Sequence, residues 1–422
     1  MYVLYNVALS IGFLLALPVY LWRGRATGKY LRTFRDRRGR VPAGIGGARP
    51  SIWVHAVSVG EVLAARPLVA ALAARLPTHP IYVSTTTVTG NAVARQGLPG
   101  AAGLFFAPFD FPGPVRRALD AVRPELLVLV ETELWPNLIH ETRRRGARVA
   151  LINGRISPRS FPRYLWLRPF FRRLLPELDL MLMQGEPHAQ RLRAMGAPPD
   201  RVRVSGNLKF DVLSPPAPSA GLRQAFAALG DRPLVVAGST VEGEEALVIQ
   251  AFREVQARVP RARLAIAPRR PERFGPAAAL VEAAGLRAQR RTQLGDRSWD
   301  GEGVLVLDTL GELASAYAFA SVVFVGGSLL PAGGHNILEA AIAERPVIVG
   351  PHMENFQEIA DAFRAAGALS VVDSAPALAG ELIALLADPA RRSELGRRGR
   401  ELIEAHRGAL EATVDALAAL VA

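Results

Sequence analysis

The fold can be deduced from Val322-Val-Phe-Val-Gly-Gly-Ser-Leu-Leu-Pro-Ala-Gly-Gly-His-Asn-Ile-Leu-Glu-Ala-Ala341. Its apolar start predicts a strand, its glycine-rich middle a loop, and its end, from about Asn336, a helix. A helix start has unpaired N–H groups and the positive end of a dipole, so it favours an anion such as phosphate. Glu339, one turn further on, could accept hydrogen bonds from ribose hydroxyls. The stretch favours a nucleotide-binding corner, although an ordinary α/β corner has the same pattern.

The same alternation recurs on both sides of Leu213–Gly221, which has the composition of a linker. Apolar runs predict strands at Ile52–His55, Ile81–Ser84, Leu126–Val130, Val149–Asn153 and Leu180–Gln184, and then at Leu234–Gly238, Leu264–Pro268, Val304–Leu307, Val322–Val325 and Val347–Val349. Strands this apolar are typical of parallel sheets covered on both faces. The sequence therefore predicts the α/β class, with two doubly wound Rossmann-like domains and ligands at the carboxyl ends of their strands.

The N-terminus predicts attachment to a membrane. Tyr2–Trp22 has no charged residue and would form an apolar helix of about 20 residues, long enough to cross a bilayer. Residues 23–40 then carry eight basic residues and one acidic residue. The positive-inside rule places this basic side, and the body that follows it, in the cytoplasm. We expect a membrane anchor at residues 1–22, spanning or inserted into one leaflet, and a basic juxtamembrane segment at 23–40.

Composition narrows the possible functions of the 422 residues. The chain has no cysteine, which excludes disulfide and thiolate chemistry. Its net charge of +13 lies largely beside the predicted anchor, which suits anionic lipid head groups better than nucleic acid. Aromatic residues make up only 7% of the chain and do not interleave with basic ones, so nucleic-acid binding is not expected.

Three motifs of the first half place charged side chains near predicted strand ends. Glu61 could act as a general base toward an alcohol, or merely complement a helix dipole. Glu131 and Glu133 follow a strand, and a metal site there is disfavoured because no third ligand has suitable spacing. Lys209, one of only two lysines among 51 basic residues, could stabilise a carboxylate or a leaving phosphate, or lie on the surface. His55 is interpreted as a buried strand histidine rather than a base.

Two motifs of the second half add weaker signals. Arg269 and Arg270 stand at a predicted strand end, where one guanidinium could bind a phosphate through two hydrogen bonds. Asp308–Glu312 follows another predicted strand and could present backbone groups to a base or a phosphate. Neither pattern is specific by itself.

The motifs occur together and in order over essentially the whole chain. They are His55-Ala-Val-Ser-Val-Gly-Glu61, Glu131-Thr-Glu-Leu-Trp-Pro136, Gly206-Asn-Leu-Lys-Phe-Asp211, Ala267-Pro-Arg-Arg-Pro-Glu-Arg-Phe274, Asp308-Thr-Leu-Gly-Glu312 and Gly333-Gly-His-Asn-Ile-Leu-Glu-Ala340 with the preceding Gly326-Gly-Ser. On these residues the chain resembles the 3-deoxy-D-manno-octulosonic acid (Kdo) transferases of Gram-negative lipopolysaccharide synthesis.

The resemblance implies a GT-B glycosyltransferase, with two Rossmann-like domains facing a cleft. Residues 41–212 would form the acceptor domain, 213–221 the linker, and 222–422 the donor domain, whose last helices can cross back. The donor would be CMP-Kdo and the acceptor a tetraacylated lipid A precursor. Transfer would take place at the cytoplasmic face of the inner membrane, invert the anomeric centre, and need neither a metal nor a cofactor.

The resemblance also implies roles for individual residues. Glu61 would be the general base, and Glu131 and Lys209 would stabilise the transition state. The CMP site would comprise Pro268, Arg269, Leu310, Gly311, Glu312, Asn336, Ile337, Leu338 and Glu339. The family pattern often has His in place of Arg270 and Met or another residue in place of Leu310, and it can have Pro in place of Ile337; these departures do not move the sites.

Two alternative functions remain open at this stage. One is another GT-B transferase, or an epimerase, that uses a uridine diphosphate sugar. The other is a catalytically silent membrane-bound binding protein with the same fold. Competition between CMP and UDP for the donor site tests the first, and loss of turnover in Glu61→Ala with CMP binding retained would exclude the second.

Overall fold

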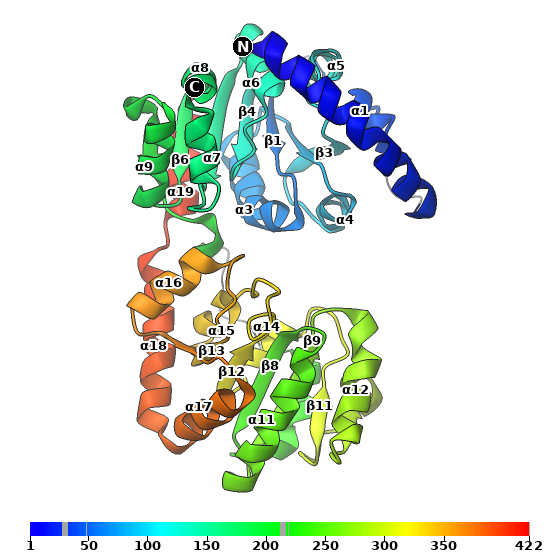
Figure 1. The fold of residues 1–422 in the computed structure, drawn as a ribbon, viewed down its shortest axis with the longest axis vertical. Helices are drawn as coiled ribbons and strands as arrows, with labels where there is room; N and C mark the ends of the chain where they lie inside the picture. The colour runs from blue at the N-terminus through cyan, green and yellow to red at the C-terminus, as the bar shows by residue number, and fades with distance from the viewer. Residues whose placement is uncertain (28–32, 48, 212–216, 218, 422) are drawn as a thin grey trace. The chain divides into compact units, whose positions relative to one another are not determined.

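The computed structural model describes residues 1–27, 33–47, 49–211, 217 and 219–421 of the chain, with side chains described outside residues 19–27. Lys29, Arg32 and most of the predicted linker at 213–221 lie outside the described residues. The chain divides into two compact units (Figure 1). We call residues 1–212 with 406–422 the N-terminal domain, and residues 213–405 the C-terminal domain.

The N-terminal domain is built on a parallel sheet of seven strands in the order β3-β2-β1-β4-β5-β6-β7. The strands are β1 (Ser51–His55), β2 (Ile81–Thr85), β3 (Ala101–Phe106), β4 (Pro124–Val130), β5 (Arg148–Gly154), β6 (Leu180–Met183) and β7 (Val202–Val204). Strands β1, β2 and β4 are buried along almost their whole length, because helices cover both faces of the sheet. The strand order reverses between β1 and β4, which is where open α/β sheets bind ligands.

Helices on the two faces complete this domain. They are α3 (Val59–Arg75), α4 (Val88–Gln96), α5 (Pro112–Val122), α6 (Pro136–Arg144), α7 (Phe161–Trp166), α8 (Arg168–Leu174), α9 (Glu186–Met195) and α19 (Ala409–Ala418), with 3-10 turns at Asp36–Arg38, Leu175–Glu177, Pro199–Arg201 and Leu208–Phe210. Proline occupies the first turn of α5 and α6, where its missing N–H would have no partner in any case. Because helices cover both faces of the sheet, each face has its own apolar core.

The N-terminal helix α1 (Tyr2–Thr27) passes close to α5 and α6 (Figure 1). Tyr5 donates a hydrogen bond to Asp110 at 2.8 Å, and Asn137 donates one to Asn6 at 2.7 Å. Within the residues that the structure describes, no helix has both the length and the apolar character needed to cross a membrane. The predicted spanning anchor is therefore not supported, and several polar side chains of α1 bond to the surface of the domain.

The C-terminal domain repeats the architecture, with a parallel sheet in the order β10-β11-β9-β8-β12-β13-β14. Its strands are β8 (Leu234–Thr240), β9 (Arg263–Pro268), β10 (Ala288–Arg290), β11 (Val304–Val306), β12 (Val322–Val325), β13 (Val347–Val349) and β14 (Leu369–Val371). The strand order reverses between β8 and β12, so the glycine loop after β12 lies at the switch point.

The helices of the C-terminal domain are α10 (Ala220–Phe226), α11 (Glu244–Arg258), α12 (Phe274–Ala283), α13 (Arg291–Leu294), α14 (Leu313–Tyr317), α15 (Leu338–Ile342), α16 (Gln357–Ala365), α17 (Ala375–Ala387) and α18 (Pro389–Ala405), with 3-10 turns at Ala227–Leu229 and Pro271–Arg273. Helices α11 and α17 lie side by side against the sheet (Figure 1). Helix α18 packs on α15 and α17, whereas the following α19 packs on α3 of the N-terminal domain.

Candidate active site

Glu61 lies in the first turn of α3, just after the carboxyl end of β1. Ser58 is the N-cap of this helix, and its hydroxyl donates to one Glu61 carboxylate oxygen at 2.7 Å. The other oxygen accepts a hydrogen bond from the backbone N–H of Val57 at 2.8 Å. The local sequence Ser-x-x-Glu matches the capping-box pattern, and the Ser58 hydroxyl also accepts the Glu61 backbone N–H at 3.5 Å. The Glu61 carboxylate, however, accepts the N–H of Val57 rather than that of Ser58. Glu61 thus stabilises the helix start while its carboxylate is held at the switch point of the sheet.

The environment of Glu61 suits a base that works near neutral pH. The side chain is only 7% exposed. Burial raises the pKa of Glu61 to about 7, against the opposing hydrogen bonds from Ser58 and Val57. The charges of Glu133 and Glu131 raise this pKa further, so these carboxylates lie near Glu61. A general base is most effective when its pKa is close to the working pH.

Glu131 and Lys209 form an ion pair, although they are 78 residues apart in the sequence. The Lys209 ammonium lies 3.0 Å from a Glu131 carboxylate oxygen, and both side chains are largely buried. Glu131 follows β4 directly and has a φ of +60°, a conformation that non-glycine residues rarely adopt. Such strain persists where the surrounding structure enforces it, and it clusters at functional sites. Here it accompanies a charged pair at the same sheet edge as Glu61.

Lys209 is positioned by two asparagines that the sequence reasoning did not single out. Asn207 caps the short 3-10 turn Leu208–Phe210 and accepts the Lys209 backbone N–H at 3.0 Å. Asn153, at the end of β5, accepts the backbone N–H of Leu208 at 3.1 Å and itself has a φ of +50°. Asn153 is fully buried, and no local sequence pattern identifies its partner 55 residues away.

The remaining polar residues of this edge have structural partners. Trp135 donates its indole N–H to Glu133 at 2.7 Å, and burial raises the pKa of Glu133. His55 is fully buried and bonds to Ser84 at 2.8 Å. Burial lowers the pKa of His55 to about 3, so it stays neutral and is poorly suited to act as a base at neutral pH. Among the described residues, no group of three possible metal ligands is found.

In the C-terminal domain, the predicted nucleotide corner follows β12. The helix α15 begins at Leu338 rather than at Asn336, with Ile337 at the N-cap position. The Asn336 side chain accepts the backbone N–H of Leu338 at 3.1 Å. Asn336 also donates to Glu339 at 3.3 Å. Burial raises the pKa of Glu339, whereas this bond and the charge of Arg269 oppose the rise. Asn336, Glu339 and Arg269 therefore lie together, as a nucleotide site requires.

The other predicted CMP-binding residues lie at the same edge of the sheet. Pro268 ends β9, and the backbone N–H of Arg269 donates to the Thr240 carbonyl at 2.9 Å. Leu310 is 76% exposed, and Gly311 has a φ of +87°, which suits glycine. These two residues and Glu312 precede α14, which packs beside α15. The Glu312 carboxylate is bound by two side chains, Thr309 at 2.6 Å and Arg291 at 3.4 Å.

The buried carboxylate of Glu244 accepts hydrogen bonds from the backbone of the glycine loop. It is fully buried, and its oxygens accept the backbone N–H groups of Gly327, Ser328 and Leu329 at 2.6, 3.1 and 2.9 Å. A fourth N–H, that of Val241, lies at 3.3 Å. Nothing in the local sequence of Glu244 reveals its contact with the glycine loop, because its three partners in the loop lie more than 80 residues further along the chain.

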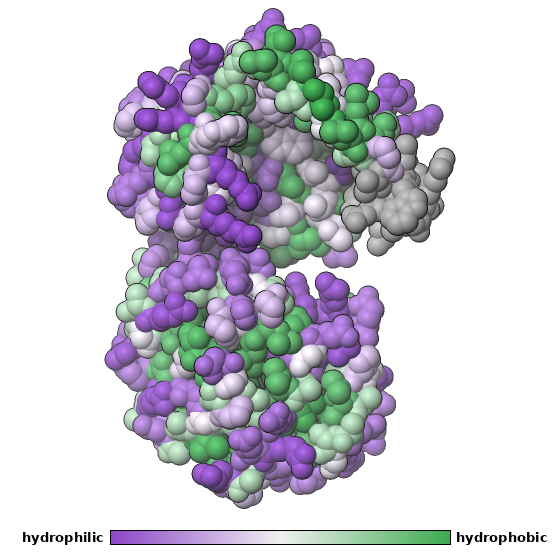
Figure 2. Space-filling model, viewed as in Figure 1, coloured by the Kyte–Doolittle hydropathy of each residue, from purple (hydrophilic) through white to green (hydrophobic). Residues whose placement is uncertain are grey.

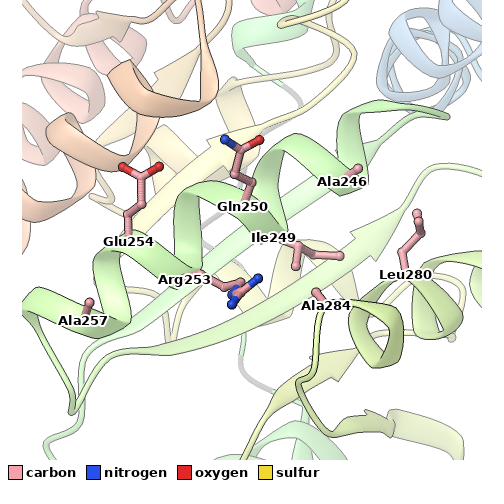
Figure 3. Close-up of a pocket in the computed structure, with 8 residues that line it drawn as sticks. All are labelled: Ala246, Ile249, Gln250, Arg253, Glu254, Ala257, Leu280 and Ala284. Atoms are coloured by element: carbon pink, nitrogen blue, oxygen red, sulfur yellow. The ribbon is translucent and has the colours of Figure 1, made fainter.

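A separate hollow of about 490 Å³ lies between α11 and α12. Figure 3 shows its lining, with Arg253 and Gln250 projecting from α11 and Leu280 and Ala284 contributed by the neighbouring segment. None of the predicted site residues lines it, and it contains mainly aliphatic side chains. The hollow is therefore separate from the candidate site residues of either domain.

Two Rossmann-like domains, each with polar side chains at the carboxyl edge of its sheet, are the architecture of the GT-B fold. The fold is similar to that of UDP-GlcNAc 2-epimerase from Neisseria meningitidis, a structure with bound UDP-GlcNAc. That likeness has a TM-score of 0.60 at 15% identity and covers 87% of this chain and 99% of the other. At this identity the likeness shows the fold alone.

Sequence relatives define the family. A profile described as 3-deoxy-D-manno-octulosonic-acid transferase (kdotransferase) matches residues 32–212. The 3-deoxy-D-manno-octulosonic acid transferase of Bordetella pertussis is 40% identical over 420 residues, covering 96% of both chains. The enzyme of the same name from Haemophilus influenzae is 34% identical and covers 87% of this chain and 86% of its own. The chain belongs to the Kdo transferase family and is a glycosyltransferase.

Proposed function

We propose that the protein transfers Kdo from CMP-Kdo to a tetraacylated lipid A precursor, with inversion and without a metal, in lipopolysaccharide synthesis. The observation that carries the proposal is the near-complete coverage of Kdo transferases at up to 40% identity. The gathering of Glu61, Glu131 and Lys209 at one sheet edge supports it. CMP-Kdo as the donor follows from the family and from the chemistry of the two sheet edges.

Glu61 is the proposed general base toward the acceptor hydroxyl. With a pKa of about 7, half of its carboxylates are ionised at neutral pH, and the ionised form can accept the hydroxyl proton as the glycosidic bond forms. Its two hydrogen bonds fix the orientation of the carboxylate before substrate binds. Direct attack of the hydroxyl on the anomeric carbon breaks the bond to the CMP phosphate and inverts the centre, so no enzyme nucleophile is required.

Glu131 and Lys209 are the proposed transition-state stabilisers. The transition state carries positive charge on the sugar ring, and CMP departs as an anion. A carboxylate and an ammonium fixed 3.0 Å apart provide one partner for each of these charges without reorganisation. Because this electrostatic work is done by side chains, the reaction as proposed needs no metal ion.

The proposed CMP site consists of the Arg269 guanidinium for the phosphate, the Glu339 carboxylate for ribose hydroxyls, and the exposed loop around Leu310 for the base. The burial of Glu339 and its hydrogen bond to Asn336 fix the carboxylate in place. Arg269 lies near enough to influence Glu339 electrostatically, so one nucleotide could contact both.

We further propose that the protein works at the cytoplasmic face of the inner membrane. Helix α1 exposes apolar side chains at helical spacing, each more than half exposed: Val3, Leu4, Val7, Ile11, Leu14 and Leu15. Figure 2 shows apolar surface along this helix. A helix with this exposed apolar surface could insert into one leaflet, and exposed basic residues such as Arg35, Arg38 and Arg40 would contact anionic lipids.

A donor-competition experiment separates this function from that of a UDP-sugar enzyme. The purified protein is titrated with CMP, CMP-Kdo, UDP and UDP-GlcNAc by calorimetry. We expect CMP and CMP-Kdo to bind, and UDP compounds to bind at least tenfold more weakly. Tighter binding of UDP-GlcNAc than of CMP-Kdo would refute the proposed donor and favour the alternative.

A further inference from the structure

A cavity of about 330 Å³ opens at the switch point of the C-terminal sheet. Its walls come from the ends of β8 and β9, the segments that follow them and the glycine loop. They include three arginines, Arg269, Arg270 and Arg273, one carboxylate, Glu242, and Thr240, Val241 and residues 330–332. None of the residues implied for CMP apart from Arg269 lines it. The cavity is therefore adjacent to the predicted nucleotide corner without being part of it.

The cavity has a surplus of positive charge. Arg273 is neutralised by Glu245 at 3.3 Å and faces the more exposed Glu242 at the same distance. Arg269 and Arg270, in contrast, have no carboxylate within 4.0 Å among the described residues. Guanidinium groups without an internal counter-ion at the edge of a cavity favour an anionic ligand, and their fork geometry matches a carboxylate or a phosphate.

Thr240 provides an independent sign of a ligand. The residue is fully buried and lines the cavity, and its hydroxyl has no hydrogen-bond partner among the described residues. Buried polar atoms in folded proteins almost always have a partner, so an orphaned hydroxyl points to a group that binds there. The preceding Ser239 has a φ of +56°, a strained conformation typical of functional sites.

Arg269 connects this cavity to the nucleotide corner. It lines the cavity, and its charge acts on both His335 and Glu339. Burial and this charge lower the pKa of His335, whereas burial raises the pKa of Glu339 against the opposing charge of Arg269. A ligand that occupies both places must carry two anionic groups separated by a short link around Arg269. In CMP-Kdo the phosphate and the sugar carboxylate are both attached to the anomeric carbon, which meets this requirement.

We propose that the cavity is the subsite for the carboxylate of the donor sugar, with Arg270 and Thr240 as its ligands and Arg269 shared with the phosphate. This inference rests on the proposed function, since it takes CMP-Kdo as the donor. A neutral sugar would leave Arg270 and the Thr240 hydroxyl without partners. The subsite thus selects a 2-keto acid sugar over the neutral sugars that uridine diphosphate carries.

The test compares CMP with CMP-Kdo, because only CMP-Kdo carries the carboxylate. Calorimetry is carried out on wild type, Arg270→Ala, Thr240→Val and the control Arg258→Ala, an exposed arginine at the far end of α11. In Arg270→Ala we expect CMP-Kdo to bind about 10- to 100-fold more weakly, as for loss of a charge-assisted hydrogen bond, and CMP to bind within threefold of wild type. Thr240→Val should weaken CMP-Kdo alone by about tenfold.

Each other outcome overturns the inference. If Arg270→Ala weakened the binding of CMP and of CMP-Kdo equally, the cavity would bind the phosphate rather than the sugar carboxylate. If Arg270→Ala bound both ligands with unchanged affinity, the cavity would not be part of the donor site. Arg270 is exposed, so its replacement should not disturb the fold, and an unchanged melting temperature verifies this. Wild type that binds neither ligand would contradict the proposed donor itself, which is a separate result.

Discussion

Replacing Glu61 with glutamine separates the chemical role of this residue from its structural one. Glutamine has the same shape, so its carbonyl oxygen can still accept the Val57 N–H and its amide can donate to Ser58. It cannot accept a proton from the acceptor hydroxyl. We expect the rate of Kdo transfer to fall about 100- to 10,000-fold, the usual contribution of a general base.

The same substitution should not destabilise the fold above neutral pH. Glu61 has a pKa of about 7 in the folded protein against an ordinary value of 4.5, so the folded state binds the proton more tightly than the unfolded state. Below about pH 4.5, ionisation of Glu61 does not affect the free energy of unfolding. Between about pH 4.5 and 7 this free energy falls as pH rises, and above pH 7 it stays about 3 kcal/mol lower. Glutamine has no charge to bury. Allowing about 1 kcal/mol for weaker hydrogen bonds, Glu61→Gln should be more stable than wild type by about 2 kcal/mol at pH 8.

Urea unfolding at pH 5 and pH 8, with initial transfer rates on the same preparations, measures both effects. Glu186→Gln is the matched control, since Glu186 is also a first-turn carboxylate but its side chain is 53% exposed. It should change neither the rate nor the pH dependence of stability appreciably. If Glu61→Gln retained more than a tenth of the activity, or were less stable than wild type at pH 8, the account of Glu61 as a buried base would be wrong.

The remaining predictions concern the neighbours of Glu61 and the glycine loop. Glu131→Gln and Lys209→Ala should each lower the transfer rate about 100- to 1,000-fold. The double variant should be little slower than either single variant, because the two groups act as a pair. Additive losses in the double variant would contradict their action as a pair. Ser58→Ala removes a hydrogen bond that lowers the pKa of Glu61, so the pH at which kcat/KM rises should move upward from about 7. Loss of the N-cap should also lower the free energy of unfolding by about 1 kcal/mol. A shift of the pH profile toward lower pH would refute Glu61 as the general base. Glu244→Ala leaves buried N–H groups of the glycine loop without acceptors, so it should lower the free energy of unfolding by more than about 3 kcal/mol and weaken CMP binding, whereas a variant with wild-type stability would show that the loop does not depend on this carboxylate.

The sheet framework could be predicted from the sequence because its strands are apolar runs with clear limits. The run Leu126–Val130 lies within β4, and Val322–Val325 coincides with β12. Four strands gave no such signal: β3 contains Gly103 and two alanines, and β7, β10 and β14 are three residues long at the sides of the sheets. Short lateral strands are defined by pairing with neighbours, which local sequence does not report.

The candidate site was predictable where a motif lies within one corner of the fold. Glu61 was expected near a strand end at a helix start, and the structure places it in the first turn of α3, bonded to the nearby Ser58. The pairing of Glu131 with Lys209 joins two strand ends 78 residues apart, and spacing alone gives no means to anticipate it. The contact between Glu244 and the glycine loop is equally unpredictable from local sequence, since only the folded domain brings the two together.

The predicted transmembrane anchor shows the limit of a composition argument. The absence of charge over Tyr2–Trp22 resembles a membrane span, yet no described helix meets the requirements for one. Tyr5 and Asn6 bond to Asp110 and Asn137 of the N-terminal domain, whereas several apolar side chains of α1 remain exposed. The local sequence does not report these two contacts, because the partners lie more than 100 residues further along the chain.

Transfer from CMP-Kdo to tetraacylated lipid A precursor, followed by mass spectrometry of the lipid, tests the central claim most directly. Wild type and Glu61→Gln are compared, with a chelator present and with added divalent metal. The account predicts that wild type increases the mass of the lipid by one or more Kdo units under both conditions, and that Glu61→Gln does so at least 100-fold more slowly. Folded wild-type protein that leaves the lipid mass unchanged under both conditions would contradict it.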